Sequence, residues 1–242
     1  MPQTKTSLSQ FGMIGLSTMG ANLARNIESR GYSVCVYNRS TEKTIRFMKE
    51  FGDGNFDSAT SLKELVQKLK RPRKLMILVK AGPAVDSVIK GLLPHLEKGD
   101  VIIEGGNSHY RDTQRREKEL KEKGIFFVGC GVSGGEEGAL KGPSLMPGGS
   151  KSAYNKVTPI LENIAAKDFS GGPCVSYIGE NGAGHYVKMV HNGIEYAIMQ
   201  MMADTYAYLR NSYRMTAPEI GEVFATLNKG KLQSYLFSIN PF

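Results

Sequence analysis

Short apolar runs alternate with longer amphipathic stretches over roughly the first half of the chain. The apolar runs have the length of buried strands and occupy residues 11–15, 32–37, 75–79, 101–104 and 125–128. The stretches between them are predicted to be helices and occupy residues 19–30, 41–51, 61–69, 84–93 and 110–123. Strands that alternate with helices of about ten residues are typical of a parallel, doubly wound sheet. The sequence therefore predicts an α/β domain of that type.

The pattern changes near residue 180, after which no apolar run of strand length occurs. Helices are predicted at residues 184–210, 216–227 and 231–238. We therefore expect a sheet domain at residues 1–180, followed at residues 181–242 by the beginning of an all-helical domain.

The first helix of this second region carries an unusual mixture of polar side chains on one face. Because they fall at positions i, i+3, i+4, i+7 and i+8, this face consists of Lys188, His191, Asn192, Glu195 and Tyr196. A base and an acid one or two turns apart suit proton-transfer chemistry, whereas a solvated ion-paired stripe is the plain alternative. Another face of the helix is predicted to be buried and consists of Val187, Val190, Ile194, Ala197 and Met201.

Composition limits the class of protein. The chain has 242 residues, of which 40% are hydrophobic and 22% are charged, as in soluble globular proteins. The three cysteines, Cys35, Cys130 and Cys174, lie singly, which argues against a disulfide framework or a zinc site and favours a reducing compartment. The first ten residues contain no apolar run, and no stretch reaches the length of a membrane span. We therefore expect a cytoplasmic protein without a metal.

The formal net charge is +8, and the positive residues are mostly dispersed along the chain. The densest basic run, Lys68–Lys74, is predicted to be a helix end followed by a turn at Pro72. This pattern favours small phosphorylated ligands over nucleic acid or a membrane surface as the reason for the charge.

A glycine-rich turn joins the first predicted strand to the first helix and reads Gly15-Leu16-Ser17-Thr18-Met19-Gly20. In dinucleotide-binding folds the first glycine of such a turn permits a tight bend, and the last permits close packing of helix on strand. The helix N-terminus then binds the pyrophosphate. Ser17 stands where a middle glycine usually does. In its strand–turn–helix context the motif favours a Rossmann-type dinucleotide site over a plain turn.

The second strand is followed by Asn38-Arg39-Ser40. A site for NAD places an acidic residue here, whereas an arginine offers a planar cation to the 2′-phosphate of NADP. Asn38 and Ser40 add hydrogen-bonding groups. The motif therefore indicates NADP, with an ordinary surface arginine as the alternative.

Glycines and polar residues also follow the later strands, at residues 79–82, 105–108 and 131–137. Open α/β sheets bind ligands at this edge. A plain alternative makes Asn107 or Ser108 a helix N-cap and pairs Ser133 with Glu136 in a capping box. Because the backbone N–H groups of paired glycines suit phosphate or an oxyanion, we favour ligand contact.

These stretches resemble the 6-phosphogluconate dehydrogenases, the NADP-dependent oxidative decarboxylases of the pentose phosphate pathway. The resemblance extends from about residue 11 to about residue 236. The matching stretches are IGLSTMG (14–20), YNRS (37–40), VKAGPAVD (79–86), GDVIIEGGNS (99–108), GVSGGEEGA (131–139), GPSLMPGG (142–149) and GAGHYVKMVHNGIEY (182–196).

The resemblance implies that Lys188 is the general base and Glu195 the general acid in the conversion of 6-phospho-D-gluconate to ribulose 5-phosphate. It implies that the substrate contacts Asn107, Ser133, Gly134, Gly135, His191, Asn192 and Tyr196. It implies that NADP contacts Gly15, Leu16, Ser17, Thr18, Met19, Gly20, Asn38, Arg39, Ser40, Val79, Lys80, Ala81 and Asn107. It also implies a homodimer with no metal and no nucleic-acid or membrane partner.

Members of this family run to roughly twice this length, and the part without a counterpart here resembles a helical domain that completes the dimer and grips the substrate phosphate. Two alternatives stay open: an NADP-binding fragment of impaired activity, and a related β-hydroxyacid dehydrogenase or imine reductase with an unphosphorylated substrate. We also expect the segment from Tyr213 onward to be mobile or to associate with another chain. The reason is that helices without a counterpart here would cover Met201, Met202, Leu209, Ile220, Val223, Phe224 and Leu236.

Overall fold

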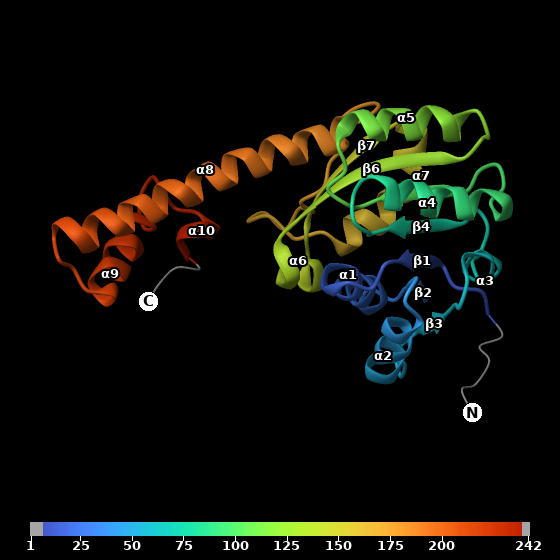
Figure 1. The fold of residues 1–242 in the computed structure, drawn as a ribbon, viewed down its shortest axis with the longest axis horizontal. Coiled ribbons are helices and arrows are strands. Elements are labelled where there is room, and N and C mark those ends of the chain that lie inside the picture. Colours follow the sequence, from blue (N-terminus) through green and yellow to red (C-terminus); the bar gives the residue numbers. More distant parts are fainter. Residues whose placement is uncertain (1–6, 239–242) are drawn as a thin grey trace. The chain divides into compact units, whose positions relative to one another are not determined.

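In the computed structural model, which describes residues 7–238, the chain divides into two compact units, residues 1–189 and 190–242. The first unit contains a seven-stranded sheet with the strand order β3-β2-β1-β4-β5-β6-β7 (Figure 1). The strands are β1 (Phe11–Ile14), β2 (Val34–Tyr37), β3 (Phe56–Ser58), β4 (Lys74–Ile77), β5 (Val101–Glu104), β6 (Phe126–Ser133) and β7 (Ser144–Gly149). Neighbouring strands from β3 to β6 are parallel, and β7 pairs with β6 in antiparallel register. This is the predicted Rossmann-type architecture, with its topological switch point between β1 and β4.

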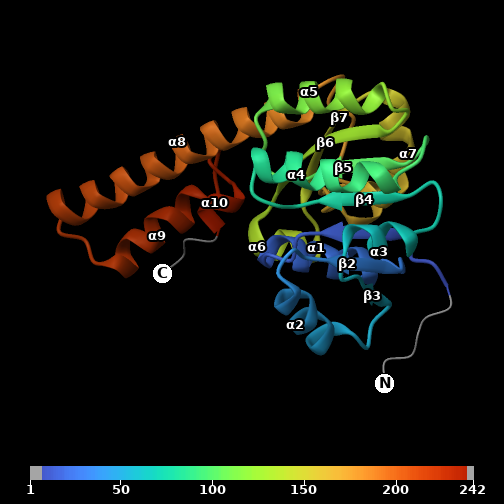
Figure 2. The ribbon, with the colours of Figure 1, turned by 45° about the vertical axis from the view of Figure 1, so that its right-hand side comes forward.

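Helices cover both faces of this sheet (Figures 1 and 2). They are α1 (Thr18–Ser29), α2 (Thr41–Phe51), α3 (Leu62–Gln67), α4 (Pro83–Leu92), the 3₁₀ helix η1 (Leu93–His95), α5 (Tyr110–Lys121), α6 (Gly135–Lys141) and α7 (Lys151–Ile164). Successive residues of a strand enter two different cores: Val101 and Ile103 pack with α1 and α7, while Ile102 packs with α3, α4 and α5. Both faces are buried, which is why the strands read as continuous apolar runs rather than as alternating patterns.

Five elements of the first unit were not predicted: β3, η1, α6, β7 and α7. Strand β7 carries Pro147 and two glycines, residues that are depleted in strands, and its antiparallel pairing departs from the wholly parallel sheet that we expected. Helix α7 contains Pro159, which obscures its periodicity. The proline and glycine residues of β7 and α7 therefore kept the hydrophobic pattern from predicting these two elements.

The second unit consists of helices: α8 (Ala183–Ser212) from residue 190 onward, α9 (Ala217–Leu227) and α10 (Tyr235–Ser238). A capping box between Thr216 and Glu219 begins α9. Of the helix predicted at residues 231–238, the structure contains only the last four residues, which form α10. The unit has a small core of its own, made of Met202, Ile220 and Phe224, with partly buried Ile198, Tyr206, Leu209, Met215, Val223, Leu227, Leu236 and Phe237 packed against it.

Two predictions about burial in this region were wrong. Met202, Ile220 and Phe224 are 8%, 1% and 6% exposed, so they have cover within the chain. The face of α8 that we expected to be buried is exposed instead, at Val187, Val190, Ile194, Ala197 and Met201. Helix α8 is apolar on more than one side, and the packing of α9 decides which side becomes a core.

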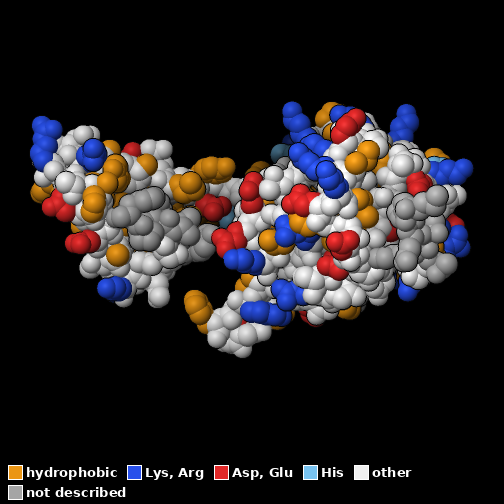
Figure 3. Space-filling view, turned by 90° about the horizontal axis from the view of Figure 1, so that it is seen from below, with side chains coloured by type: hydrophobic (Ala, Val, Ile, Leu, Met, Phe, Trp, Pro, Cys, Tyr) orange, Lys and Arg blue, Asp and Glu red, His pale blue; other side chains and the backbone are white. Residues whose placement is uncertain are grey.

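On the face shown in Figure 3, Lys and Arg side chains are scattered among Asp and Glu rather than gathered into one patch. Within residues 7–238, no helix is long and apolar enough to cross a membrane, and no group of His, Cys, Asp and Glu side chains could hold a metal ion.

Candidate active site

A cleft of about 430 Å³ opens at the carboxyl edge of the sheet, around the switch point between β1 and β4. Open α/β sheets bind ligands at this position. The cleft is lined by Gly15, Ser17, Met19, Asn38, Lys43, Leu78, Val79, Lys80, Ala81, Gly105, Gly106, Asn107 and Val132. The fold thus brings together predicted residues from four separate loops, namely Gly15, Ser17, Met19, Asn38, Val79, Lys80, Ala81 and Asn107.

The glycine-rich turn has the geometry that its sequence predicts. Gly15 has φ +101°, and a Cβ there would lie 2.3 Å from the carbonyl oxygen of Leu78. A Cβ on Gly20 would lie 2.0 Å from the Gly15 carbonyl oxygen, so helix and turn can approach only without side chains. Ser17 is the N-cap of α1, its side chain makes no capping hydrogen bond, and the first turn carries no acidic residue. The positive end of α1 is therefore well suited to bind an anion.

The residues after β2 differ in their contacts: Asn38 makes structural hydrogen bonds, whereas Arg39 and Ser40 are exposed. The Asn38 side chain accepts a hydrogen bond from Leu16 N–H at 3.0 Å and donates one to the Ser40 carbonyl, so it ties the two loops together. Arg39 and Ser40 are exposed, and the Ser40 hydroxyl donates to Glu42. That hydrogen bond lowers the pKa of the Glu42 carboxyl.

Lys43 is a cleft residue that the sequence reasoning missed. It lies in the first turn of α2 and lines the cleft together with Asn38 and Lys80. The available signal was its place four residues after Arg39, on the helix that begins just after the motif. Lys43 on α2 and Lys80 after β4 therefore bring positive charge to the cleft, and Arg39 follows the cleft residue Asn38.

Lys188 lies near the start of α8 and is only 7% exposed. Glycines permit this placement: a Cβ on Gly131 of β6 would lie 2.5 Å from Lys188 Cβ, and one on Gly184 would lie 2.3 Å from the Gly129 carbonyl oxygen. The first turns of α8 are thus seated directly on β6. Val132, the residue after Gly131, lines the cleft. The stem of a mostly buried lysine therefore lies against Gly131, the strand residue that precedes the cleft-lining Val132.

The other polar residues of α8 belong to the second compact unit. His191 Nδ1 lies 3.5 Å from Glu195 Oε2 and 3.3 Å from Asn192 Oδ1, and the His191 and Glu195 side chains are each 37% exposed. Tyr196 is exposed. The plain alternative of an ion-paired stripe thus accounts for the His191–Glu195 pair.

Both capping alternatives at the sheet edge are wrong. The N-cap of α5 is His109, which accepts from Arg111 N–H, so Asn107 and Ser108 are not caps. The N-cap of α6 is Gly134, with φ +130° and no side-chain cap, so Ser133 and Glu136 form no capping box. Ser133 ends β6, and Gly135 follows with φ +61°. Both glycines adopt left-handed backbone conformations that turn the chain sharply at the end of β6.

The close seating of α8 on β6 gives a direct prediction. Gly131→Ala should lower the free energy of unfolding by about 1–3 kcal/mol, because the added methyl collides with a Cβ that the helix backbone holds in place. Gly230→Ala is the matched control, since a Cβ there meets only the Leu227 carbonyl oxygen at 3.7 Å. Urea unfolding followed by circular dichroism measures the difference, and equal stabilities of the two variants would contradict it.

Two protein-family models match the chain. The NAD binding domain of 6-phosphogluconate dehydrogenase matches residues 10–179, and the C-terminal domain of the same enzyme matches residues 184–241. The chain belongs to the 6-phosphogluconate dehydrogenase family. Within this family, it is 59% identical to the NADP(+)-dependent, decarboxylating 6-phosphogluconate dehydrogenase of Bacillus subtilis, over 96% of this chain and 50% of that protein. It is 54% identical to the decarboxylating enzyme of Lactococcus lactis subsp. lactis, over 95% of this chain and 49% of that protein.

Solved structures agree with this membership. The 6-phosphogluconate dehydrogenase of Plasmodium falciparum, studied without ligand, with NADP+ and with 6-phosphogluconate, is 46% identical. It superimposes with a TM-score of 0.90, over 96% of this chain and 50% of that one. A 3-hydroxyisobutyrate dehydrogenase of Salmonella typhimurium, 21% identical with a TM-score of 0.75, shares the fold. The chain spans about half the length of these three 6-phosphogluconate dehydrogenases.

Proposed function

We propose that this chain is the coenzyme-binding and catalytic half of an NADP-dependent, decarboxylating 6-phosphogluconate dehydrogenase. Such an enzyme converts 6-phospho-D-gluconate to ribulose 5-phosphate and CO₂. The observation that carries the proposal is the buried Lys188, seated on β6 at Gly131 while the adjacent Val132 lines the cleft. A plain surface stripe would not leave a lysine only 7% exposed against the strand that carries a cleft-lining residue.

In this proposal, NADP occupies the cleft with its pyrophosphate at the N-terminus of α1. Its 2′-phosphate is bound by Arg39, Ser40 and Lys43 after β2. The remaining coenzyme contacts are those predicted from the sequence, namely Gly15, Leu16, Ser17, Thr18, Met19, Gly20, Asn38, Val79, Lys80, Ala81 and Asn107. The positive φ of Gly15, the α1 N-terminus without a side-chain cap and the lysines of the cleft wall support this arrangement.

The substrate assignment rests on residues at the end of β6 and on α8. The proposed contacts are Asn107, Ser133, Gly134, Gly135, His191, Asn192 and Tyr196. On a continuous helix, the seven-residue spacing of Lys188 and Glu195 corresponds to about two turns, so both side chains leave the same face.

The chemistry requires one base and one acid. When bound, NADP would supply the acceptor for the hydride that leaves the carbon carrying the β-hydroxyl. Lys188 takes the hydroxyl proton as the general base. The resulting ammonium then hydrogen-bonds the ketone oxygen while the carboxylate leaves as CO₂. Glu195 protonates the carbon that lost the carboxylate, which completes the enediol-to-ketone step.

We further propose that the functional division of the chain falls near residue 180, with the coenzyme domain before it and the start of a helical dimerisation domain after it. The separate family models for residues 10–179 and 184–241 support this division. A homodimer, a cytoplasmic location, and a role in the pentose phosphate pathway and gluconate utilisation are part of the same proposal.

One experiment distinguishes this function from its alternatives. NADP reduction is measured with 6-phosphogluconate, gluconate and 3-hydroxyisobutyrate as parallel substrates. We expect slow but detectable turnover, and only with the phosphorylated acid, whereas preference for 3-hydroxyisobutyrate would establish the β-hydroxyacid dehydrogenase alternative. Binding of NADP without turnover of any substrate would establish the impaired fragment. The likeness to 3-hydroxyisobutyrate dehydrogenases and imine reductases, at 14–21% identity, supports only a shared fold.

Coenzyme preference gives a second test. The chain should bind NADP more tightly than NAD by about 1–3 kcal/mol, the range of charge-assisted hydrogen bonds. Arg39→Asp should erase or reverse this preference, and Lys43→Ala should reduce it. Arg46→Asp, an exposed change on the same helix α2, is the control and should preserve it. Calorimetric titration of each variant with both coenzymes measures the affinities; equal binding of both coenzymes by the unchanged chain would refute the assignment.

A further inference from the structure

Glu104 is a buried carboxylate at the edge of the cleft. It ends β5 and is 0% exposed. Its Oε1 accepts a hydrogen bond of 3.0 Å from the backbone N–H of Gly106, which lines the cleft. A Cβ on Gly106 would lie 2.8 Å from the same oxygen. The carboxylate therefore sets the position of the loop 105–107, which forms one wall of the cleft.

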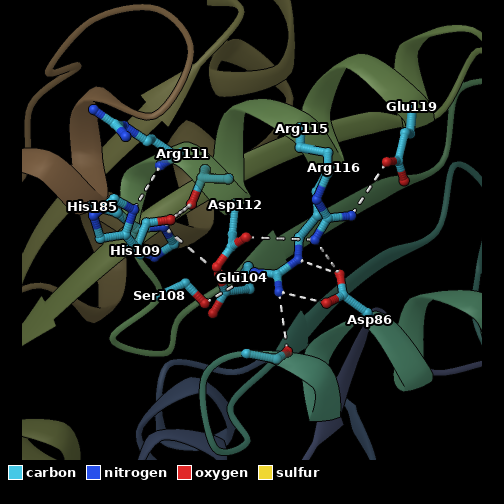
Figure 4. Close-up of polar contacts among 12 residues, drawn as sticks. Asp86, Glu104, Ser108, His109, Arg111, Asp112, Arg115, Arg116, Glu119 and His185 are labelled. Carbon is cyan, nitrogen blue, oxygen red and sulfur yellow. Dashed lines mark hydrogen bonds and ion pairs between the residues drawn. The ribbon is translucent and has the colours of Figure 1, made fainter.

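The second oxygen of Glu104 is not satisfied. Among the described residues, Oε2 has no hydrogen-bond partner; it lies 3.6 Å from His185 Nδ1 and 3.7 Å from Arg116 Nη1. Figure 4 shows Glu104 between these two side chains. Burying a polar atom without a hydrogen-bond partner costs folding free energy. The groups nearest to Oε2 are therefore the ones that can supply a partner.

Arg116 is committed elsewhere. Its Nε donates to Asp86 Oδ1 at 2.8 Å, its Nη2 donates to Asp86 Oδ2 and to the Gly82 carbonyl, and its Nη1 donates to Ser108 Oγ (Figure 4). These bonds, together with the hydrogen bond that Arg115 donates to Asp86 Oδ1, lower the pKa of Asp86 to about 2. The Arg116 guanidinium thus holds α4 and two cleft loops on α5, and it pairs with Glu104 Oε2 only at 3.7 Å, without a hydrogen bond. His185 is the second group that lies near Glu104 Oε2.

His185 is the third residue of α8 and is 1% exposed. Its Nδ1 lies 2.7 Å from Thr113 Oγ1, while Nε2 has no hydrogen-bond partner among the described residues. Burial lowers the pKa of this imidazole; the Glu104 charge and the backbone carbonyls of Glu104 and Gly106 oppose that shift, and the Arg116 charge adds to it. The ring therefore faces the cleft loop and its two charged neighbours. Lys188 follows three residues later, on the same side of the helix.

We propose that Glu104 and His185 are positioning residues that link the cleft loop 105–107 to the first turns of α8, which carry Lys188. The inference rests on the proposed NADP site. A movement of the loop by roughly half an ångström, followed by the carboxylate that Gly106 N–H holds, brings Glu104 Oε2 within hydrogen-bond distance of His185 Nδ1, whose N–H is then shared with Thr113 Oγ1. Catalytic-site hydrogen bonds that are long in the free protein commonly tighten when the ligand binds. Coenzyme in the cleft thereby draws His185, and with it the turn that bears Lys188, into position.

Nuclear magnetic resonance of the imidazole nitrogens tests this link without relying on turnover. The chain contains four histidines, His95, His109, His185 and His191, so their ring signals can be assigned individually. On saturation with NADP, the His185 ring signals should shift although His185 does not line the cleft. The signals of His95, which lies in η1 and outside the cleft lining, should not move. A histidine with a purely structural role would not respond to the coenzyme.

Glu104→Gln then separates charge from shape. The amide oxygen can still accept from Gly106 N–H, but the bond is no longer charge-assisted, so NADP affinity should fall about five- to tenfold. The NADP-induced shift of His185 should be lost at saturation. Glu119→Gln, which removes an exposed carboxylate of α5, is the matched control and should leave both readouts unchanged. His185→Asn should lower the NADP affinity as well, and adding it to Glu104→Gln should cause little further loss, because linked residues are not additive.

The outcomes are distinguishable. If the unchanged chain does not bind NADP, the proposed coenzyme site falls and this link falls with it. If NADP binds but the His185 signals stay in place, or if Glu104→Gln binds NADP as Glu119→Gln does, the link alone is overturned. Should Glu104→Gln fail to fold, His185→Asn and the ring signals of the unchanged chain decide the question.

Discussion

Lys188→Ala is expected to slow hydride transfer by about 10²–10⁴-fold, because the proposed base for the hydroxyl proton is removed. Lys188 is 7% exposed and its stem packs on Gly131, so the truncated side chain cannot be replaced by a neighbour without moving α8. Single-turnover formation of NADPH, in a subunit of the full length of the relatives, measures this step. Lys121→Ala, an exposed change on α5, is the control. Normal NADPH formation in the Lys188 variant would eliminate the lysine as base.

Glu195→Gln should divide the reaction differently. Hydride transfer and CO₂ release should be less affected, while protonation of the enediol should slow by about 10²–10⁴-fold. Glu195 is half-exposed and paired with His191, so it can exchange protons with solvent between turnovers. Asp204→Asn on the same helix is the matched control. Equal losses in NADPH formation for Glu195→Gln and Lys188→Ala would argue against separate acid and base roles.

The 242-residue chain itself is expected to bind NADP but to turn over 6-phosphogluconate several orders of magnitude more slowly than its longer relatives. The residues that line the cleft lie between Gly15 and Val132, within the first compact unit. The relatives extend to about twice this length. We propose that their residues for the substrate phosphate lie in the part that has no counterpart here. Binding energy from a remote phosphate is used to orient the reacting carbon, so its loss lowers the rate of the chemical step as well as affinity.

Calorimetry with NADP and a coupled assay with 6-phosphogluconate test this expectation together. NADP affinity within a few-fold of that of a full-length relative, with very slow turnover, is the expected result. Near-normal turnover would refute it and would mean that residues of this chain hold the substrate phosphate. The expected loss of turnover does not come from exposed apolar side chains at Met202, Ile220 and Phe224, because these residues are buried within the second unit.

Local sequence determined the parts of this protein that depend on local geometry. The Gly15–Gly20 turn was predictable because only glycine allows the backbone conformation of Gly15 and the close approach at Gly20. The five strands from β1 to β6 other than β3 were predictable because a sheet buried on both faces needs continuous apolar runs. The seven-residue spacing of Lys188 and Glu195 puts both on one helical face by the helical repeat alone.

Tertiary structure decided which of several locally equivalent options was realised. Helix α8 is apolar on more than one side, and only the packing of α9 selected Met202 over Val190 and Ile194 for burial. Ser133–Glu136 has capping-box spacing, but the turn at Gly134 moves the helix start past it. Lys43 lines the cleft together with residues of other elements, and Glu104 and His185 are remote from each other in sequence. Periodicity along the chain could therefore reveal neither arrangement. A sequence pattern records the conformation of neighbouring residues; burial, charge and contact depend on what the rest of the chain places against them.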